Sequence, residues 1–291
     1  MCKRYANGVQ ALDNVSLTVA PGMFGLLGPN GAGKSTLMRT LATLQEADSG
    51  SAKLDEIDVL REKDRVRSLL GYLPQDFGVY PKVSAQEMLD HFARLKGITN
   101  SRERKATVDA LLERTNLASV RKQKLGGFSG GMRQRFGIAQ ALIGNPKLII
   151  VDEPTAGLDP EERVRFLNLL AGIGRDAIVI LSTHIVDDVA DLCPNFAVIS
   201  KGKVMLTGQP AAAVATVQGK IWRRAVPRDE LETIQKELPV ISSRLQSGET
   251  VVRAYADAAP GPGFESVTPE LEDVYFSTVS GHLSGQQQAA A

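Results

Sequence analysis

The feature that most constrains this chain is the glycine-rich segment GPNGAGKS at residues 28–35. It follows the apolar run MFGLLG (23–28), which predicts a short buried strand, and it precedes a helix predicted from about Thr36 to Leu44. Glycines at such a junction let backbone amides close around phosphate oxygens, and the helix start adds a favourable dipole. The alternative is an ordinary glycine-rich turn. The pattern predicts a nucleotide phosphate site formed by Gly28, Pro29, Asn30, Gly31, Ala32, Gly33, Lys34, Ser35 and Thr36.

Carboxylates are predicted at the same site. Within the loop, Lys34 is expected to reach the β and γ phosphates and Ser35 to bind Mg²⁺. The run LIIVDE (148–153) predicts a strand buried on both faces that ends at Asp152, which directs this carboxylate towards the Mg²⁺ shell. Glu153, one residue later, is placed to polarise an attacking water. Such a pair could instead cap a turn, but a phosphate loop of this type needs an acidic partner.

A histidine follows the next predicted strand. His184 stands directly after AIVILST (177–183) and before a predicted helix. Such a residue is as often a hydrogen-bonded polar group at a strand end as a contact to the γ-phosphate that holds the water and the base. His91, in an amphipathic helix, and His282, near the C-terminus, receive no catalytic role. The histidines and cysteines form no cluster in the sequence, so a zinc site is not predicted.

The order of predicted elements indicates an α/β fold. A strand at 148–154, a helix around 160–172 and a strand at 177–183 form a β-α-β unit, which implies parallel pairing. Residues 11–19 alternate apolar and polar side chains, which predicts a half-buried strand. Residues 196–208 predict a closing hairpin.

Other segments divide the chain further. Residues 51–60 predict a hairpin, although its turn pair, Asp55 and Glu56, lacks the usual glycine. A capping box at Ser84 and Glu87 predicts the start of a helical region. The expected division is a core at 1–210 with a helical insert at about 76–145, a small α+β accessory region at 211–279 and a disordered tail at 280–291.

Composition and charge narrow the function classes. The 291 residues include 34 basic and 33 acidic ones, and a net charge of +1 gives no general electrostatic reason to bind nucleic acid. Two cysteines, Cys2 and Cys193, predict no disulfide framework. No run approaches the roughly 20 apolar residues needed to cross a bilayer, and the start lacks the apolar core of a signal peptide. We expect a cytosolic protein that needs another chain for any membrane part.

With these residues considered together, the chain resembles the ATP-binding subunit of an ABC transporter over roughly residues 1–210. GPNGAGKST resembles the family's Walker A loop, Gln75 its Q-loop glutamine, and LIIVDE its Walker B strand with the catalytic glutamate. The segment SGG resembles its signature, with Ser129, Gly130 and Gly131. The resemblance implies a RecA-like P-loop NTPase core with an antiparallel β subdomain and an α-helical insert.

Three further positions follow the family's order. Tyr5 falls where the family stacks adenine on an aromatic ring, Asp159 in AGLD falls in its D-loop, and His184 matches its switch histidine. The resemblance implies catalytic roles for Glu153, His184 and Gln75. It also implies ATP and Mg²⁺ as cofactors, with the Mg²⁺ ligands Ser35, Gln75 and Asp152.

The family also implies partners. Its subunits work as head-to-tail pairs, so a homodimer is expected in which each ATP lies between the Walker A loop of one subunit and the signature of the other. A separate transmembrane permease is expected to contact residues 76–84, and no nucleic acid is expected. The segments FSGGMRQR (128–135) and LEDVYF (271–276) are similar to ATPases of type-2 exporters, which implies export and a peripheral place on the cytoplasmic face of the cell membrane.

The chain departs from the family pattern at a few positions. Only four residues precede Tyr5, where the family builds a longer first strand. In the signature, Phe128 replaces Leu and Met132 replaces Gln. If Ser129 caps a helix, a Gln at position 132 could return a bond to the cap, and its loss is predicted to cost about 0.3–1 kcal/mol at the helix start. The groups expected to face phosphate are kept, so the site is still predicted to close on ATP.

Three functions are weighed. The leading hypothesis is a motor subunit in which ATP hydrolysis drives an export permease. One alternative is a soluble ABC ATPase acting on DNA or ribosomes, but the chain lacks the coiled-coil insertion, zinc cysteines or second cassette that mark such relatives. The other is a regulator that binds ATP and hardly hydrolyses it. Intact Glu153, Gln75 and His184 count against that function.

Overall fold

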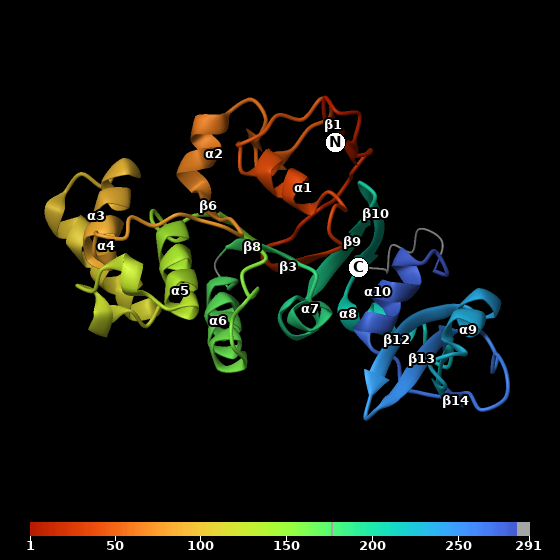
Figure 1. Cartoon of the computed structure of the whole chain (residues 1–291). Helices are drawn as coiled ribbons and strands as arrows, with labels where there is room; N and C mark the ends of the chain where they lie inside the picture. Colours follow the sequence, from red (N-terminus) through yellow and green to blue (C-terminus); the bar gives the residue numbers. More distant parts are fainter. Residues whose placement is uncertain (176, 284–291) are drawn as a thin grey trace.

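The computed structural model describes residues 1–175 and 177–283, and its centre is a largely parallel sheet (Figure 1). Its strands lie in the order β10–β9–β3–β8–β7–β6. The outer strand β10 is antiparallel to β9, and all other neighbours are parallel. The strands are β3 (Gly22–Leu27), β6 (Leu70–Leu73), β7 (Leu148–Asp152), β8 (Ile178–Thr183), β9 (Asn195–Ser200) and β10 (Lys203–Gly208).

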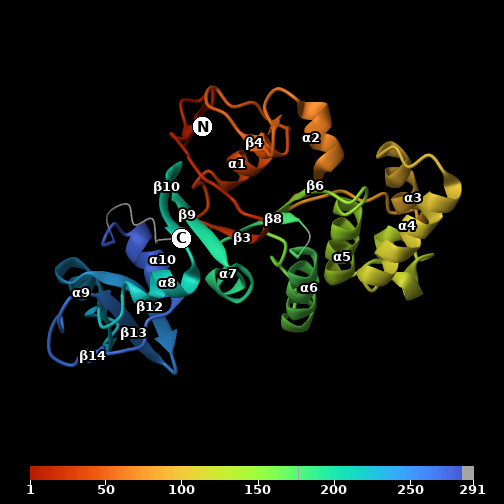
Figure 2. The ribbon, with the colours of Figure 1, turned by 180° about the vertical axis from the view of Figure 1, so that it is seen from behind.

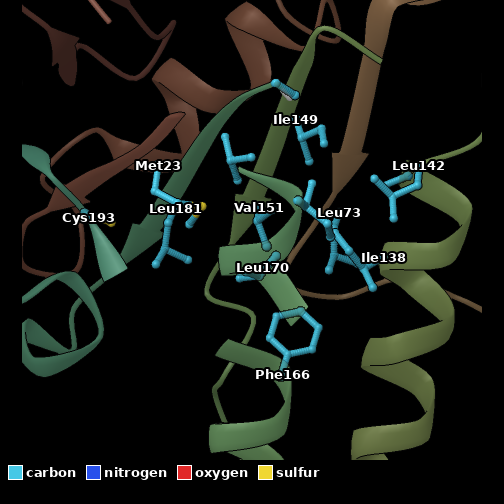
Figure 3. Close-up of a cluster of buried hydrophobic side chains, with 14 of the residues drawn as sticks. Met23, Leu73, Ile138, Leu142, Ile149, Val151, Phe166, Leu170, Leu181 and Cys193 are labelled. Carbon is cyan, nitrogen blue, oxygen red and sulfur yellow. The ribbon is translucent and has the colours of Figure 1, made fainter. Parts of the chain in front are cut away.

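Helices cover both faces of this sheet, as Figures 1 and 2 show from opposite sides. On one face α1 (Lys34–Leu41) packs over a core that includes Leu26 and Ile150. On the other face the core includes Val151 and Phe166, and in Figure 3 their side chains lie between the sheet and the helices with Leu170 between them. This second face carries α5 (Gly130–Ala141), α6 (Pro160–Ile173) and α7 (Val186–Leu192). The α/β class is therefore confirmed.

The parallel strands bring several predicted residues to one edge. Parallel strands share their direction, so the loops that follow β3, β6, β7 and β8 all leave the sheet at the same carboxyl edge. These loops contain the phosphate loop at 28–35, Gln75, the pair Asp152–Glu153 and His184. The fold thus places at one edge the side chains that the sequence assigned to nucleotide and metal.

A group of helices lies between β6 and β7. The predicted capping box is confirmed, because Ser84 Oγ accepts a hydrogen bond from the Glu87 amide at 3.3 Å and Glu87 Oε2 accepts one from the Ser84 amide at 2.9 Å. The helices around β6 are α2 (Lys63–Leu69), α3 (Ala85–Leu95) and α4 (Ser101–Arg114), followed by single 3₁₀ turns at Ala118–Val120 and Leu125–Gly127.

The N-terminal hairpins include one correction. The predicted hairpin at 51–60 is confirmed, and Asp55 takes the left-handed turn conformation (φ 52°) that Asp tolerates better than most residues. The strand predicted over 11–19 is wrong beyond Leu12. Val15 is buried as its pattern required, but no strand in the described part of the chain pairs with residues 13–20. The hairpins are formed by β1 (Lys3–Arg4) with β2 (Gln10–Leu12) and by β4 (Lys53–Leu54) with β5 (Ile57–Asp58).

The C-terminal part forms a second, antiparallel sheet in the order β12–β13–β11–β14. A small core that includes Val226, Ile234 and Val252 joins α9 to this sheet. The last helix returns to pack on α7 and α8, and its Leu271 and Val274 join the main core. The elements are α8 (Pro210–Ala215), β11 (Ile221–Val226), α9 (Leu231–Glu237), β12 (Val240–Gln246), β13 (Glu249–Tyr255), β14 (Glu265–Ser266) and α10 (Leu271–Val279).

The predicted division into a core at 1–210, an accessory region at 211–279 and a tail at 280–291 stays a prediction. Apolar contacts of α10 cross the boundary that the sequence placed at 210. Most of the tail expected at 280–291 lies outside the described residues. Within 1–175 and 177–283, no helix is long and apolar enough to cross a membrane.

Candidate nucleotide-binding site

The glycine-rich loop wraps around its own lysine. Lys34 is buried, and its Nζ donates hydrogen bonds to the carbonyls of Gly28 at 2.5 Å and Pro29 at 3.4 Å. Gly33 has φ 107°, and a side chain there would overlap the Ala11 carbonyl. Only glycine therefore fits this position, which sets the path of the loop into α1.

The Asp152 carboxylate has the environment of a metal ligand. It is 4% exposed at the end of β7, and its Oδ1 is buried without a hydrogen-bond partner. Ser182, its neighbour on β8, also has a buried hydroxyl with no partner. An unpaired buried carboxylate oxygen is costly unless a cation or donor completes it, so the residues fit Mg²⁺. Ser35, at the start of α1, offers an exposed hydroxyl.

Glu153 occupies the centre of the site. Its carboxylate is buried, with Oε1 3.5 Å from Lys34 Nζ and Oε2 2.6 Å from His184 Nδ1. Its backbone has φ 47°, a conformation that non-glycine residues seldom adopt and that often marks functional positions. The Glu153 amide donates to the Ser182 carbonyl at 2.8 Å, which holds this conformation. The structure thus brings Lys34, Glu153 and His184 into direct contact.

Two predicted residues flank this cluster. Tyr5 is 38% exposed beside α1, and its hydroxyl forms 3.0 Å hydrogen bonds with Thr36 and Gln45. Gln75 lies two residues past the end of β6 and is exposed. Neither side chain contacts Glu153, but each is next to an element of the phosphate site, Tyr5 at α1 and Gln75 at the shared carboxyl edge.

The segment FSGGMRQR lies away from the phosphate loop. It begins α5, which packs with α6 and β6 on the opposite face of the sheet from α1. Ser129 is the N-cap, as predicted, and its Oγ accepts a hydrogen bond from the Met132 amide at 3.2 Å. Phe128 is buried edge-on against Phe136. The Leu-to-Phe departure therefore serves core packing, while Ser129 and Gly130 stay exposed.

Comparisons with known proteins give the family. The protein-family model described as "ABC transporter" matches residues 12–156 of this sequence. The "Uncharacterized ABC transporter ATP-binding protein YxlF" of Bacillus subtilis is 33% identical over 295 residues, which cover 96% of this chain and 97% of that protein. The chain belongs to the ABC transporter family. A solved structure confirms the RecA-like P-loop core that the resemblance implied. It is the ATP-binding cassette MJ0796, in a dimeric post-hydrolysis state bound to ADP and Pi. Its TM-score with this chain is 0.65 at 26% sequence identity, and the match covers 72% of this chain and 95% of that one.

Two other relatives carry transport names. The "Nod factor export ATP-binding protein I" of Paraburkholderia xenovorans is 35% identical over 254 residues, covering 86% of this chain and 82% of that protein. The "Probable multidrug ABC transporter ATP-binding protein YbhF" of Escherichia coli K12 is 33% identical over 273 residues, covering 88% of this chain. The chain spans about half (47%) of the length of YbhF.

One part of this ABC site was missed by sequence reasoning. Asp188 on α7 has a fully buried side chain that accepts a hydrogen bond from Thr155 Oγ1 at 2.7 Å and from Arg163 Nε at 2.9 Å. Thr155 is two residues past Glu153, and Arg163 is on α6. Asp188 therefore ties the segment after Walker B to the helix that follows His184. In the sequence it looked like one of two acidic residues at a helix start.

The charges of the Walker B acids extend into the surrounding core. Burial first, and the Asp152 charge second, raise the pKa of the Tyr72 hydroxyl on β6. Burial and then the Glu153 charge raise the pKa of Tyr275 on α10. The C-terminal helix, with its LEDVYF sequence, therefore lies within electrostatic reach of Glu153.

The Met132 departure in the ABC signature leads to a prediction. Met132 is partly buried against the core, and Ser129 already caps its amide. Met132→Gln would add the missing reciprocal cap, worth about 0.3–1 kcal/mol, and would lose part of the apolar packing of Met132, so the two effects partly offset each other. We expect ATPase activity to change by less than about threefold, measured as phosphate release. A rise of about a hundredfold or more would show instead that the native signature is impaired.

Proposed function

We propose that this protein is the ATP-binding and ATP-hydrolysing motor subunit of an ABC transporter. The observation that carries the proposal is the position of Glu153, which is buried between Lys34 Nζ and His184 Nδ1 and follows the strand ending in Asp152. A carboxylate beside a phosphate-binding lysine and aligned by a histidine is suited to take a proton from water attacking the γ-phosphate. A regulator that only binds nucleotide would have no need of this arrangement.

The same proposal assigns the remaining residues of the site. The loop from Gly28 to Thr36 binds the ATP phosphates, and the Tyr5 ring stacks on adenine while Thr36 and Gln45 hold its hydroxyl. Bound Mg²⁺ neutralises phosphate charge. The residues that would hold it are Ser35, Asp152 and Gln75.

We further propose a head-to-tail homodimer. The signature helix α5 packs on the opposite face of the sheet from α1, the helix that continues the phosphate loop, so one chain does not close both motifs on one nucleotide. Ser129 Oγ accepts the Met132 amide, which leaves its O–H free to donate to a phosphate oxygen of the partner's ATP. Gly130 offers an exposed amide beside it, and Asp159 lies in the D-loop next to this surface. The dimeric state named for MJ0796 supports this arrangement.

The permease is the second proposed partner. Residues 76–84 leave the carboxyl edge beside the nucleotide site and are largely exposed, with Tyr80 at 65% exposure. A loop that starts at the catalytic edge and ends at the capping box of α3 can report the state of the site to a docked protein. The names of the Nod factor and multidrug relatives support export. Docking on a permease would hold the protein at the cytoplasmic face of the membrane.

A mixing experiment tests the shared site. Lys34→Ala removes the phosphate lysine and Ser129→Arg blocks the signature, so each homodimer alone is expected to be inactive. In a mixed dimer one site carries both changes and the other carries neither. Equal mixing is expected to restore about a quarter of native phosphate release, because half the dimers are mixed and each has one intact site.

Two results would count against the proposal. No recovery on mixing, with native-like folding of both variants by circular dichroism, would show that the loop and the signature do not combine between subunits. Full activity of Ser129→Arg alone would show that the signature is not part of the site. A mixture of Lys34→Ala with itself gives the baseline without complementation, because every dimer in it lacks the phosphate lysine at both sites.

A further inference from the structure

The two glycines of the signature are glycines for different reasons. Among the described residues, a Cβ at Gly130 would have a single neighbour within 4 Å, Leu158 Cδ2 at 3.9 Å. A Cβ at Gly131 would lie 2.7 Å from the carboxylate carbon of Glu162 and 2.8 Å from its Cγ. Gly131 is inside α5 and is not among the positive-φ residues, so its backbone would accept any side chain. A side chain at position 131 would therefore have to displace the Glu162 carboxylate from its place beside α5.

Glu162 connects two elements that carry functional motifs. Its Oε2 lies 3.3 Å from Arg135 Nη1 on the signature helix, and both side chains are largely buried, at 17% and 11% exposure. Its Oε1 accepts a hydrogen bond from Arg165 Nη1 at 3.1 Å. Its backbone amide donates to Asp159 Oδ1 at 2.9 Å, which caps α6. One residue thus joins the D-loop aspartate to the helix that begins at Ser129.

We infer that Glu162 is a positioning residue that holds the signature in a fixed place relative to the D-loop of the same subunit. Gly131, which has no side chain, leaves the space that the Glu162 carboxylate occupies. This inference rests on the proposed function, in which both motifs meet the partner's ATP. A surface that must fit a neighbouring subunit needs its parts fixed relative to one another before contact. The Arg135–Glu162 pair fixes the start of α5 against the start of α6.

The burial of the pair makes this link matter more than a surface ion pair. Arg135 is a buried residue, and its Nε has no hydrogen-bond partner within the described structure. Its charge is therefore compensated mainly by Glu162, and removing that carboxylate leaves a largely buried guanidinium unpaired. Arg165 is half exposed, so its contact with Glu162 adds little.

A double-mutant cycle tests the contact and its role. Gly131→Ala, Glu162→Ala and the double variant are compared with the native protein for kcat and for the thermal unfolding midpoint. We expect Gly131→Ala to lower kcat about tenfold in the native background but about twofold or less with Glu162→Ala, because the methyl group then has room. Gly130→Ala is the matched control, and its loss should be the same in both backgrounds.

A milder variant separates positioning from folding. Glu162→Gln keeps the shape and loses the charge. We expect its kcat to fall about fivefold while the affinity of the isolated subunit for ATP, measured by fluorescence titration, stays within about twofold of native. Equal losses from Gly131→Ala in both backgrounds would overturn the inference. So would a fall in ATP affinity as large as the fall in kcat.

The unfolding midpoints distinguish this inference from the proposed function. They report the Gly131–Glu162 contact without ATP or a partner subunit. Coupling in the midpoints together with failed recovery in the mixing experiment would refute the role of the signature in a shared site and, with it, the positioning role. Absence of coupling in both midpoints and kcat would refute the contact itself, whatever the mixing experiment shows.

Discussion

Glu153→Gln is expected to lower ATP turnover by about a hundredfold or more while ATP binding persists. The amide keeps the size of the side chain and can still bond His184, but it cannot take a proton from water. It also removes the negative charge 3.5 Å from Lys34 Nζ, which otherwise competes with phosphate for this lysine. ATP should therefore hold the dimer together longer. Phosphate release, nucleotide titration and light scattering with Mg²⁺-ATP measure the three effects.

A neighbouring acid provides the control for this change. Glu161 on α6 is 75% exposed, and its one ion pair within the described residues is with Arg165, so Glu161→Gln should leave turnover within about twofold of native. Turnover of Glu153→Gln near the native rate would show that Glu153 is not the base. Loss of ATP binding together with turnover would place Glu153 in nucleotide binding instead.

Asp188→Ala is expected to lower the free energy of unfolding by about 2–4 kcal/mol and to lower turnover as well. The change removes the fully buried carboxylate that Thr155 and Arg163 share, and it leaves both donors without their partner. Because Thr155 is two residues from Glu153, loss of its anchor should also loosen the strained segment that carries the base. Urea unfolding and phosphate release measure the two effects.

The adjacent aspartate makes a matched control. Asp187 occupies the same helix and is exposed, so Asp187→Ala should change unfolding by less than about 0.5 kcal/mol. Asp188→Asn, which keeps one acceptor oxygen for Thr155, should fall between the two. If Asp188→Ala and Asp187→Ala had the same free energy of unfolding, the hydrogen bonds of Asp188 with Thr155 and Arg163 would not contribute to stability.

The sequence alone was sufficient to predict those helices and strands that are determined by residues close to one another in the chain. The apolar run at 148–152 predicts β7, because a strand buried on both faces needs no alternation. Ser84 and Glu87 predict the start of α3, because both capping bonds span three residues. Residues 11–19 failed for the opposite reason. Their alternation does bury Val15, but a strand also needs a partner, and pairing is decided by distant parts of the chain.

The site divides in the same way. Lys34, Asp152, Glu153 and His184 could be predicted because each lies at the carboxyl end of a strand of a parallel sheet or in the loop after it, and such strands end at one edge. Asp188 could not, since its partner Thr155 is 33 positions away and its burial breaks the apolar spacing of α7. Glu162 likewise looked like a helix-start acid. Its role depends on how closely α5 approaches α6.

The return of α10 to the main core makes the order of synthesis matter. Leu271, Val274 and Tyr275 pack into the cluster that also holds Val189 and Phe196. A ribosome adds about 5–20 residues per second, so this cluster stays open for some seconds after β10 has been made. A chain that stops early leaves an apolar face that chaperones and proteases can recognise. The main core is therefore complete only in a chain translated through α10, because Leu271, Val274 and Tyr275 supply part of it.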